Sequence, residues 1–247
     1  MTEQKLARAE ARIDELTGEL KRVRKELEQF AYIISHDFQG PVRNIEALAE
    51  MVCKRYRGKV GDDAEQCLTF ISDSAETLRR LLGAMVSYSR LGRVSLDLAP
   101  VDSGTLVDEI VTELQSKEES PSAQIEVGEM PVVTAHPGLL GQVFKHLLDN
   151  ALKFAAGDAQ ITVSACRLDG QWQFSVADNG IGIDAQHHEV VFTVFRRLHP
   201  PADYPGLGMG LAICKFIVER HGGRIRIDSE VGKGATVRFT LPDQEHK

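Results

Sequence analysis

The sequence predicts a helical N-terminal part followed by an α/β part, divided into three domains over residues 1–30, 31–92 and 93–247. Two observations support this division. Up to about residue 90, apolar residues recur at the spacing of a helix. Beyond residue 100, short segments with the alternation of β-strands appear between helical segments. Helices and strands in this order favour an α/β sandwich, a mixed sheet with helices on one face.

The first domain carries a heptad repeat, in which apolar residues alternate in steps of three and four. The repeat consists of Leu6, Ala9, Ile13, Leu16, Leu20, Val23, Leu27, Phe30 and Ile34. A stripe this narrow gives a single helix no core, so we expect residues 1–30 to form a coiled coil with a second copy of the chain. The coiled coil is either a passive dimerisation stalk or a stalk that transmits a signal from an upstream sensor domain or protein.

The second domain begins with Ser35-His36-Asp37-Phe38-Gln39-Gly40-Pro41, in a helix expected to run to about Tyr56. His36 lies off the apolar stripe, so its imidazole is expected to face solvent. After a turn near Gly58 to Asp62, a second helix carries an apolar face from Ala64 to Met85. Two antiparallel helices per chain predict a four-helix bundle in a homodimer.

The third domain follows a linker predicted over Gly92 to Pro100. The expected helices cover residues 102–115, 137–155 and 210–220, and the expected strands cover 161–166, 172–177, 224–228 and 236–241.

Composition excludes several classes of protein. The formal charge of −7 argues against a general nucleic-acid-binding protein. The four cysteines are scattered without a CxxC pair, which is typical of reduced thiols. No apolar run approaches the ~20 residues that span a membrane. We therefore expect a cytoplasmic chain without a membrane segment.

Three motifs in the third domain are of the kinds that bind nucleotides. In the first, His146, Asn150 and Lys153 share one face of a helix by their spacing. The amide oxygen of Asn150 is a suitable ligand for Mg²⁺. Taken alone, an asparagine on a helix is usually a solvated surface residue.

The second and third motifs are rich in glycine. In Asp178-Asn179-Gly180-Ile181-Gly182, the carboxylate can accept a hydrogen bond from an exocyclic amine such as that of adenine, and the glycines allow close backbone approach. Gly206-Leu207-Gly208-Met209-Gly210 opens a helix, where free backbone N–H groups favour phosphate. The spacing fits neither a P-loop nor a dinucleotide fingerprint. Taken alone, each motif is also consistent with a tight turn.

The segment between these motifs, residues 184–205, contains two phenylalanines, two arginines and three prolines. We expect it to form a lid whose aromatic residues, Phe192 and Phe195, anchor it and whose arginines meet phosphate charge. The alternative is an exposed surface loop.

The order and spacing of these motifs resemble those of the sensor histidine kinases of bacterial two-component systems. Ser35-His36-Asp37 with Pro41 looks like the H box, Asn150 to Phe154 the N box, Asp178-x-Gly180-x-Gly182 the G1 box, Phe192 to Phe195 the F box and Gly206-x-Gly208-x-Gly210 the G2 box. The resemblance covers residues 30 to 242. The stretch from His36 to Arg43, and Arg-Leu-His before Tyr-Pro-Gly, are similar to the phytochrome-like branch of the family.

The resemblance implies a function and roles for these residues. ATP phosphorylates His36, Asp37 orients its imidazole, and the phosphoryl group then passes to an aspartate in the receiver domain of a response regulator. Asp178 binds adenine, Asn150 and Mg²⁺ bridge the phosphates, and Lys153 and Arg197 offset phosphate charge. The glycines at 180, 182, 206, 208 and 210 complete the ATP site. His146 stands where the N box usually begins with asparagine, and imidazole is a poorer Mg²⁺ ligand.

Two other classes of function remain open. The chain could be a degenerate kinase-fold scaffold that regulates other kinases without phosphorylating itself, which His146 favours. It could instead be an ATPase of the DNA gyrase type that shares the nucleotide fold. The H box and the predicted bundle oppose that assignment.

Overall fold

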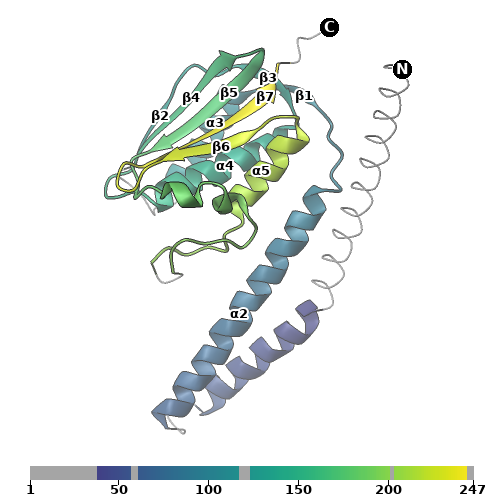
Figure 1. The fold of residues 1–247 in the computed structure, drawn as a ribbon. Coiled ribbons are helices and arrows are strands. Elements are labelled where there is room, and N and C mark those ends of the chain that lie inside the picture. Colours follow the sequence, from purple (N-terminus) through teal and green to yellow (C-terminus); the bar gives the residue numbers. More distant parts are fainter. Residues whose placement is uncertain (1–37, 57–60, 117–122, 201–202, 244–247) are drawn as a thin grey trace, which may run out of the picture. The chain divides into compact units, whose positions relative to one another are not determined.

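The computed structural model describes residues 38–56, 61–116, 123–200 and 203–243. The chain divides into two compact units, Met1–Val94 and Ser95–Lys247, each drawn in Figure 1. The predicted coiled coil over residues 1–30 lies outside the described residues, and so do His36 and Asp37. Of the first unit, the structure therefore describes the helical hairpin that follows His36.

The hairpin consists of a helix over residues 38–56 and of α2 (Asp62–Leu91), which runs antiparallel to it (Figure 1). An ion pair joins the two helices, with Nε of Arg79 3.0 Å from Oε2 of Glu46. Small and branched residues are buried along the hairpin: Val42, Ala49, Ala75, Leu82 and Val86. The two helices expected from the apolar spacing are thus present.

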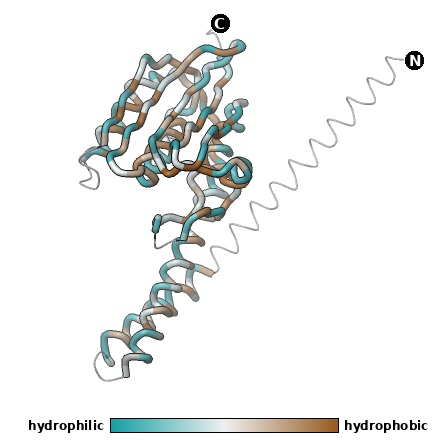
Figure 2. Tube along the Cα trace, turned by 60° about the vertical axis from the view of Figure 1, so that its left-hand side comes forward, coloured by the Kyte–Doolittle hydropathy of each residue, from teal (hydrophilic) through white to brown (hydrophobic). Residues whose placement is uncertain are grey.

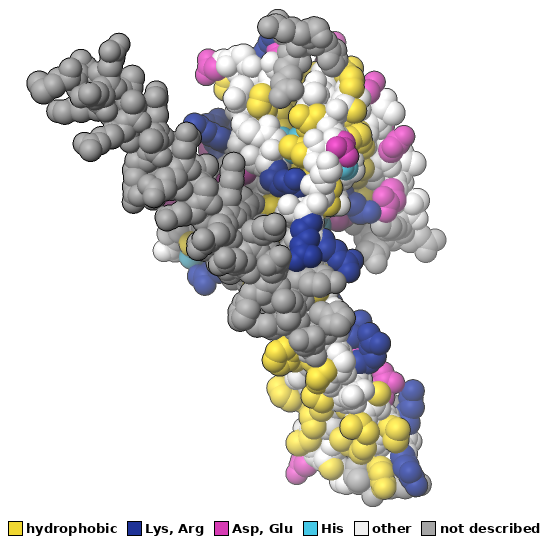
Figure 3. All heavy atoms as spheres, turned by 90° about the vertical axis from the view of Figure 1, so that its right-hand side faces the viewer, with side chains coloured by type: hydrophobic (Ala, Val, Ile, Leu, Met, Phe, Trp, Pro, Cys, Tyr) yellow, Lys and Arg dark blue, Asp and Glu magenta, His cyan; other side chains and the backbone are white. Residues whose placement is uncertain are grey.

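Larger apolar residues of the hairpin stay exposed. They are Phe38, Ile45, Leu48, Met51 and Tyr56 on the first helix and Phe70, Ile71 and Leu78 on α2, and we call them the hairpin apolar face. Figure 3 shows apolar side chains gathered over the hairpin. Phe70 keeps 74% of its surface exposed. Within one chain, this surface is not covered by the described residues.

The second unit is built on a five-stranded sheet. Its strands, in spatial order, are β2 (Gln124–Val127), β4 (Gln160–Leu168), β5 (Gln171–Asp178), β7 (Ala235–Pro242) and β6 (Ile225–Ser229). β2 pairs parallel with β4, and the other pairs are antiparallel, which confirms the mixed sheet. The helices α3 (Ser103–Ser116), α4 (Pro137–Lys153) and α5 (Gly210–Arg220) cover one face (Figure 1).

Buried and more exposed residues alternate along β4, β5 and β7, which separates a core face from a polar face. Figure 2 shows the hydropathy of the residues along these strands. On the core face, the rings of Phe174 and Phe239 stack at 5.0 Å. Phe144 of α4 meets both edge-on, at 5.6 and 5.5 Å. The strands β4 and β5 join through Asp169 and Gly170, whose φ angles of 48° and 71° form the two-residue turn that suits strand twist. Just after this turn, Trp172 of β5 pairs with Leu241 of β7.

Three strands were not expected from the sequence. β1 (Ala99–Asp102) pairs antiparallel with β3 (Val132–Ala135), and β2 extends the main sheet. β1 occupies the end of the predicted linker, so the irregular segment stops at Leu98. Asp102 closes β1 instead of opening a helix, and its Oδ1 accepts hydrogen bonds from the backbone of Gly104 and Thr105 at the start of α3.

α4 and α5 lie antiparallel, and one histidine joins their far ends. Nδ1 of His221, just after α5, donates to the carbonyl of Ile217 at 2.8 Å. Nε2 accepts from the backbone N–H of His136, just before α4, at 3.1 Å. These two bonds require a neutral ring, and burial lowers the pKa of His221 accordingly. The opposite ends of the two helices meet at the cavity described next.

Candidate functional site

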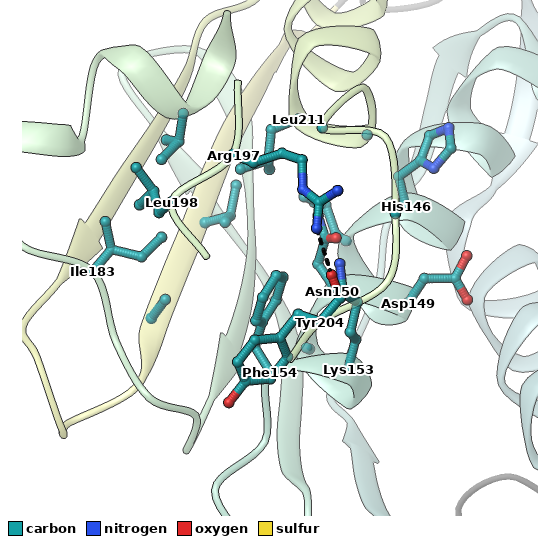
Figure 4. Close-up of a pocket in the computed structure, with 18 of the residues that line it drawn as sticks. His146, Asp149, Asn150, Lys153, Phe154, Ile183, Arg197, Leu198, Tyr204 and Leu211 are labelled. Carbon is teal, nitrogen blue, oxygen red and sulfur yellow. Dashed lines mark hydrogen bonds between the residues drawn. The ribbon is translucent and has the colours of Figure 1, made fainter. Parts of the chain in front are cut away.

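A cavity of about 400 Å³ lies between the last turns of α4, the start of α5 and the end of β5. Nine of the residues predicted to bind a nucleotide line it: His146, Asn150, Lys153, Asp178, Gly182, Arg197, Gly206, Gly208 and Gly210. Figure 4 draws residues that line this space as sticks. Gly180 was predicted with them but does not line the cavity. Three motifs that are far apart in the sequence therefore meet at one place.

Asp178 is the last residue of β5, and one of its two carboxylate oxygens already accepts hydrogen bonds. Oδ1 accepts hydrogen bonds from the backbone of Gly180 at 2.8 Å and of Ala235 at 3.1 Å. Burial raises the pKa of Asp178, and the two backbone hydrogen bonds oppose that rise. Among the described residues, no donor contacts Oδ2. One oxygen of the carboxylate is thus fixed, and the other remains for a donor in the cavity.

Gly180 and Gly182 let the loop after β5 pass through crowded space. A Cβ on Gly180 would lie 2.5 Å from the carbonyl oxygen of Phe154, at the end of α4. Gly182 has a φ of 69°, and a Cβ there would overlap the carbonyl oxygen of Glu230. Gly180 therefore acts behind the cavity wall, where it sets the distance between Asp178 and α4.

The last turns of α4 present His146, Asn150 and Lys153 to the cavity (Figure 4). A Cβ on Gly210 would lie 3.5 Å from Nδ2 of Asn150 and 3.7 Å from Nδ1 of His146, so both side chains lie against the start of α5. Burial lowers the pKa of His146, although the charge of Asp149 opposes that shift. A neutral His146 adds no positive charge to the cavity.

Two cations face the same end of the cavity. Burial lowers the pKa of Lys153, and the positive charge of Arg197 lowers it further. A Cβ on Gly206 would lie 3.1 Å from Nζ of Lys153, so the glycine-rich segment passes directly beside the amine. Within the described part of the chain, neither cation has an acidic partner. Two mutually repelling positive charges beside a helix N-terminus favour an anionic ligand.

An aromatic cluster at this site was not predicted from the sequence. The ring of Tyr204 lies 4.8 Å from that of Phe154 and 5.3 Å from that of His199. Nη2 of Arg197 donates to the carbonyl oxygen of Tyr204 at 2.8 Å, the dashed line in Figure 4. Phe154 and Tyr204 do stand in the motifs quoted above, but spacing alone gives no sign that they meet.

The expected lid contains two short 3₁₀ helices, η1 (Ala185–His187) and η2 (Val190–Phe192). Neither Phe192 nor Phe195 lines the cavity, and 38% of the surface of Phe195 is exposed. Instead, His199 and Tyr204 make the aromatic contacts of this segment with Phe154, the residue that follows α4.

Comparisons with known proteins agree with this geometry. Residues 135–245 match the family of histidine kinase-, DNA gyrase B-, and HSP90-like ATPases. Cyanobacterial phytochrome A of Nostoc sp. is 37% identical over 229 residues, which are 92% of this chain and 30% of that protein. Phytochrome-like protein Cph1 of Synechocystis sp. is also 37% identical, over 92% of this chain and 31% of its own length. The chain belongs to the sensor histidine kinases, on their phytochrome-like branch.

One solved structure has a similar fold. Full-length ShkA in complex with AMPPNP matches 87% of this chain and 45% of its own, with a TM-score of 0.62 and 26% identity. This sensor histidine kinase chain spans about a third of the length of the phytochromes that it matches. Among the described residues, no helix is both long and apolar enough to cross a membrane.

Proposed function

We propose that the chain is a protein histidine kinase, which transfers the γ-phosphoryl group of ATP to His36 and then to an aspartate of a response regulator. The observation that carries the proposal is the arrangement of charge around the cavity. At the end of β5 stands a carboxylate oxygen without a partner among the described residues, and two cations stand beside the start of α5. A nucleotide such as ATP complements this arrangement, because the amine of its base can donate to the carboxylate and its phosphates can meet the two cations.

The cavity residues take the following roles in the proposal. Asp178 accepts a hydrogen bond from the adenine amine through Oδ2. Lys153 and Arg197 offset phosphate charge, and the glycine-rich start of α5 offers backbone N–H groups. The amide oxygen of Asn150 supplies a ligand for Mg²⁺. The described residues contain no group of three or more His, Cys, Asp or Glu side chains suited to a metal. Mg²⁺ would therefore bind together with the nucleotide, whose phosphates supply further ligands.

His36 is the nucleophile and Asp37 its orienting partner in this proposal. A free imidazole has a pKa near ~6.5, so it is mostly neutral at physiological pH and keeps a lone pair for attack. Asp37 would accept a hydrogen bond from one ring nitrogen and turn the other toward the phosphate. His36 thus acts in the domain over 31–92, and ATP binds in the domain over 93–247.

The partners follow from the same proposal. A second copy of the chain would pair through the coiled coil of residues 1–30 and the hairpin apolar face. The receiver domain of a response regulator accepts the phosphoryl group, and an upstream sensor acts through the stalk. The scaffold alternative requires a nucleotide site that has lost its contacts. The convergence of nine predicted residues on one cavity supports the active kinase instead.

The test is incubation with γ-labelled ATP and Mg²⁺, followed by treatment of the protein with acid. We expect an acid-labile label on the wild-type chain and no label on His36→Gln, with unchanged nucleotide affinity by calorimetry. His187→Gln is the matched control, because His187 does not line the cavity. Label that persists in His36→Gln would identify another acceptor. ATP binding without any label would favour the scaffold.

A further inference from the structure

We propose that Tyr204 is a positioning residue that holds the guanidinium of Arg197 at the phosphate end of the cavity. The inference rests on the proposed function, because the contact that it explains is the contact between Arg197 and ATP. It begins with a single bond. Nη2 of Arg197 donates to the carbonyl oxygen of Tyr204 at 2.8 Å, and Figure 4 shows the arginine side chain extended toward Asn150 and Tyr204.

Arg197 needs such a partner because its surroundings work against its position. Burial lowers the pKa of Lys153 and the charge of Arg197 lowers it further, because two cations this close repel each other. A free arginine side chain also has rotamer entropy that favours other orientations. The Tyr204 carbonyl offsets both effects with one charge-assisted hydrogen bond. It occupies only one of five N–H donors, so the others remain for a phosphate.

The carbonyl of Tyr204 is itself fixed by the tyrosine ring. That ring packs 4.8 Å from the ring of Phe154 and 5.3 Å from the ring of His199. Phe154 directly follows the last residue of α4, and its backbone N–H donates to the carbonyl of Asn150 at 3.0 Å. The position of Tyr204 is therefore set against the helix that carries Asn150 and Lys153.

The chain after Tyr204 is held in the same way. Gly206 lies so close to Lys153 that a Cβ there would be 3.1 Å from the amine nitrogen. A Cβ on Gly208 would overlap the carbonyl oxygen of Arg196, so this segment also packs against the backbone next to Arg197. The segment over 204–208 thus contacts both cations, and Tyr204 is the residue whose side chain ties it to α4.

The experiment compares nucleotides with and without phosphates on the full chain. Tyr204→Ala removes the ring, and Tyr204→Phe keeps it. Calorimetry measures the affinity for the non-hydrolysable analogue AMP-PNP and for adenosine. Tyr204→Ala keeps the backbone carbonyl but removes the ring that fixes its position. We therefore expect the contact between Arg197 and a phosphate to be lost, so that AMP-PNP binding weakens about tenfold more than adenosine binding. Tyr204→Phe should bind both ligands like the wild type.

A double-mutant cycle with Arg197→Ala separates positioning from stacking. If Tyr204 acts through Arg197, adding Tyr204→Ala to Arg197→Ala should weaken AMP-PNP binding by less than twofold. Additive losses, or equal losses for AMP-PNP and adenosine, would overturn the inference. Tyr204→Leu, which keeps apolar volume, replaces Tyr204→Ala in the cycle if the latter does not fold. A wild-type chain that fails to bind AMP-PNP would instead contradict the proposed function.

Discussion

Asp178 binds the loop after β5 through one carboxylate oxygen, and in the proposed function it binds the nucleotide through the other. Oδ1 accepts two backbone hydrogen bonds, from Gly180 and from Ala235. These bonds join the loop after β5 to the first residue of β7. They also fix the plane of the carboxylate, so the direction of Oδ2 is set before any nucleotide binds.

We expect Asp178→Asn to weaken ATP binding by about ten- to a hundredfold. The asparagine oxygen would replace Oδ1, because two backbone N–H groups require an acceptor there. The amide nitrogen would then face the cavity and place a donor opposite the donor amine of adenine. Calorimetry with ATP checks the affinity, and thermal unfolding checks that the loop is intact. An unchanged affinity would show that the base does not bind at Asp178.

His221 predicts how the stability of the second unit depends on pH. Burial, together with the charges of His136 and Arg220, lowers its pKa below the value near ~6.5 of an unfolded chain, although the hydrogen bond to Ile217 opposes the shift. The folded state therefore binds fewer protons than the unfolded state. The contribution of His221 is fully present above pH ~6.5 and is lost as the pH falls from there toward the folded pKa.

Denaturant unfolding of the full chain between pH 8 and 5 measures this effect. We expect the wild type to lose about 1 kcal/mol more stability on acidification than His221→Gln, since protonation removes the acceptor for the His136 N–H. His187→Gln serves as the control and should behave like the wild type. If the unfolding free energies of the wild type and of His221→Gln fell in parallel with pH, His221 would not be the cause of the pH dependence.

At the scale of elements, substitutions at two glycines with nearly equal φ can distinguish the cost of backbone strain from the cost of steric crowding. Gly170, in the β4–β5 turn, has a φ of 71°, and no atom of the described residues lies within 4 Å of a Cβ built there. Gly182 has a φ of 69°, but its Cβ would overlap the backbone of Glu230. We expect Gly170→Ala to cost about 1 kcal/mol of unfolding free energy, and Gly182→Ala to cost clearly more and to weaken ATP binding. Equal costs would mean that the loop after β5 is not tightly held.

The long elements could be predicted from the sequence, and the short ones could not. α4, α5 and the strands β4 to β7 lie within about two residues of their expected bounds, because each repeats its apolar period several times. β1, β2 and β3 have four residues each, too few for alternation to stand out. β1 also contains Pro100, which favoured a linker.

The same limit applies to the site. His146, Asn150 and Lys153 share a helix, so their spacing is enough to place them on one face. Residue type was enough to propose Asp178 and the glycine motifs as nucleotide-binding residues, but no local signal in the sequence indicates that they meet α4. Tyr204 and Phe154 were missed because their contact joins segments 50 residues apart, and such contacts depend on the tertiary fold. His36 and Asp37 stay predictions, since they lie outside the described residues.

At the scale of the whole molecule, the hairpin apolar face predicts how two chains associate. Leu48 on this face and Val132 on the second unit each keep 59% of their surface exposed. If the hairpins form a four-helix bundle, Leu48→Glu buries a charge at the interface and should raise the dimer dissociation constant at least tenfold. Val132→Glu is the matched control and should leave it unchanged. Sedimentation velocity measures both, and a monomeric wild-type chain at micromolar concentration would contradict the homodimer.

The register of β5 has one further, practical consequence. Trp172, which pairs with Leu241, is the only tryptophan of the chain. It lies six residues before Asp178 on the same strand, about 20 Å away at the usual rise of a strand. The fluorescence of Trp172 therefore reports the unfolding of the second unit. Because Trp172 lies far from Asp178, a nucleotide bound there would not contact its ring. Far-ultraviolet circular dichroism also includes the hairpin helices. If the two signals change at different denaturant concentrations, the units unfold independently.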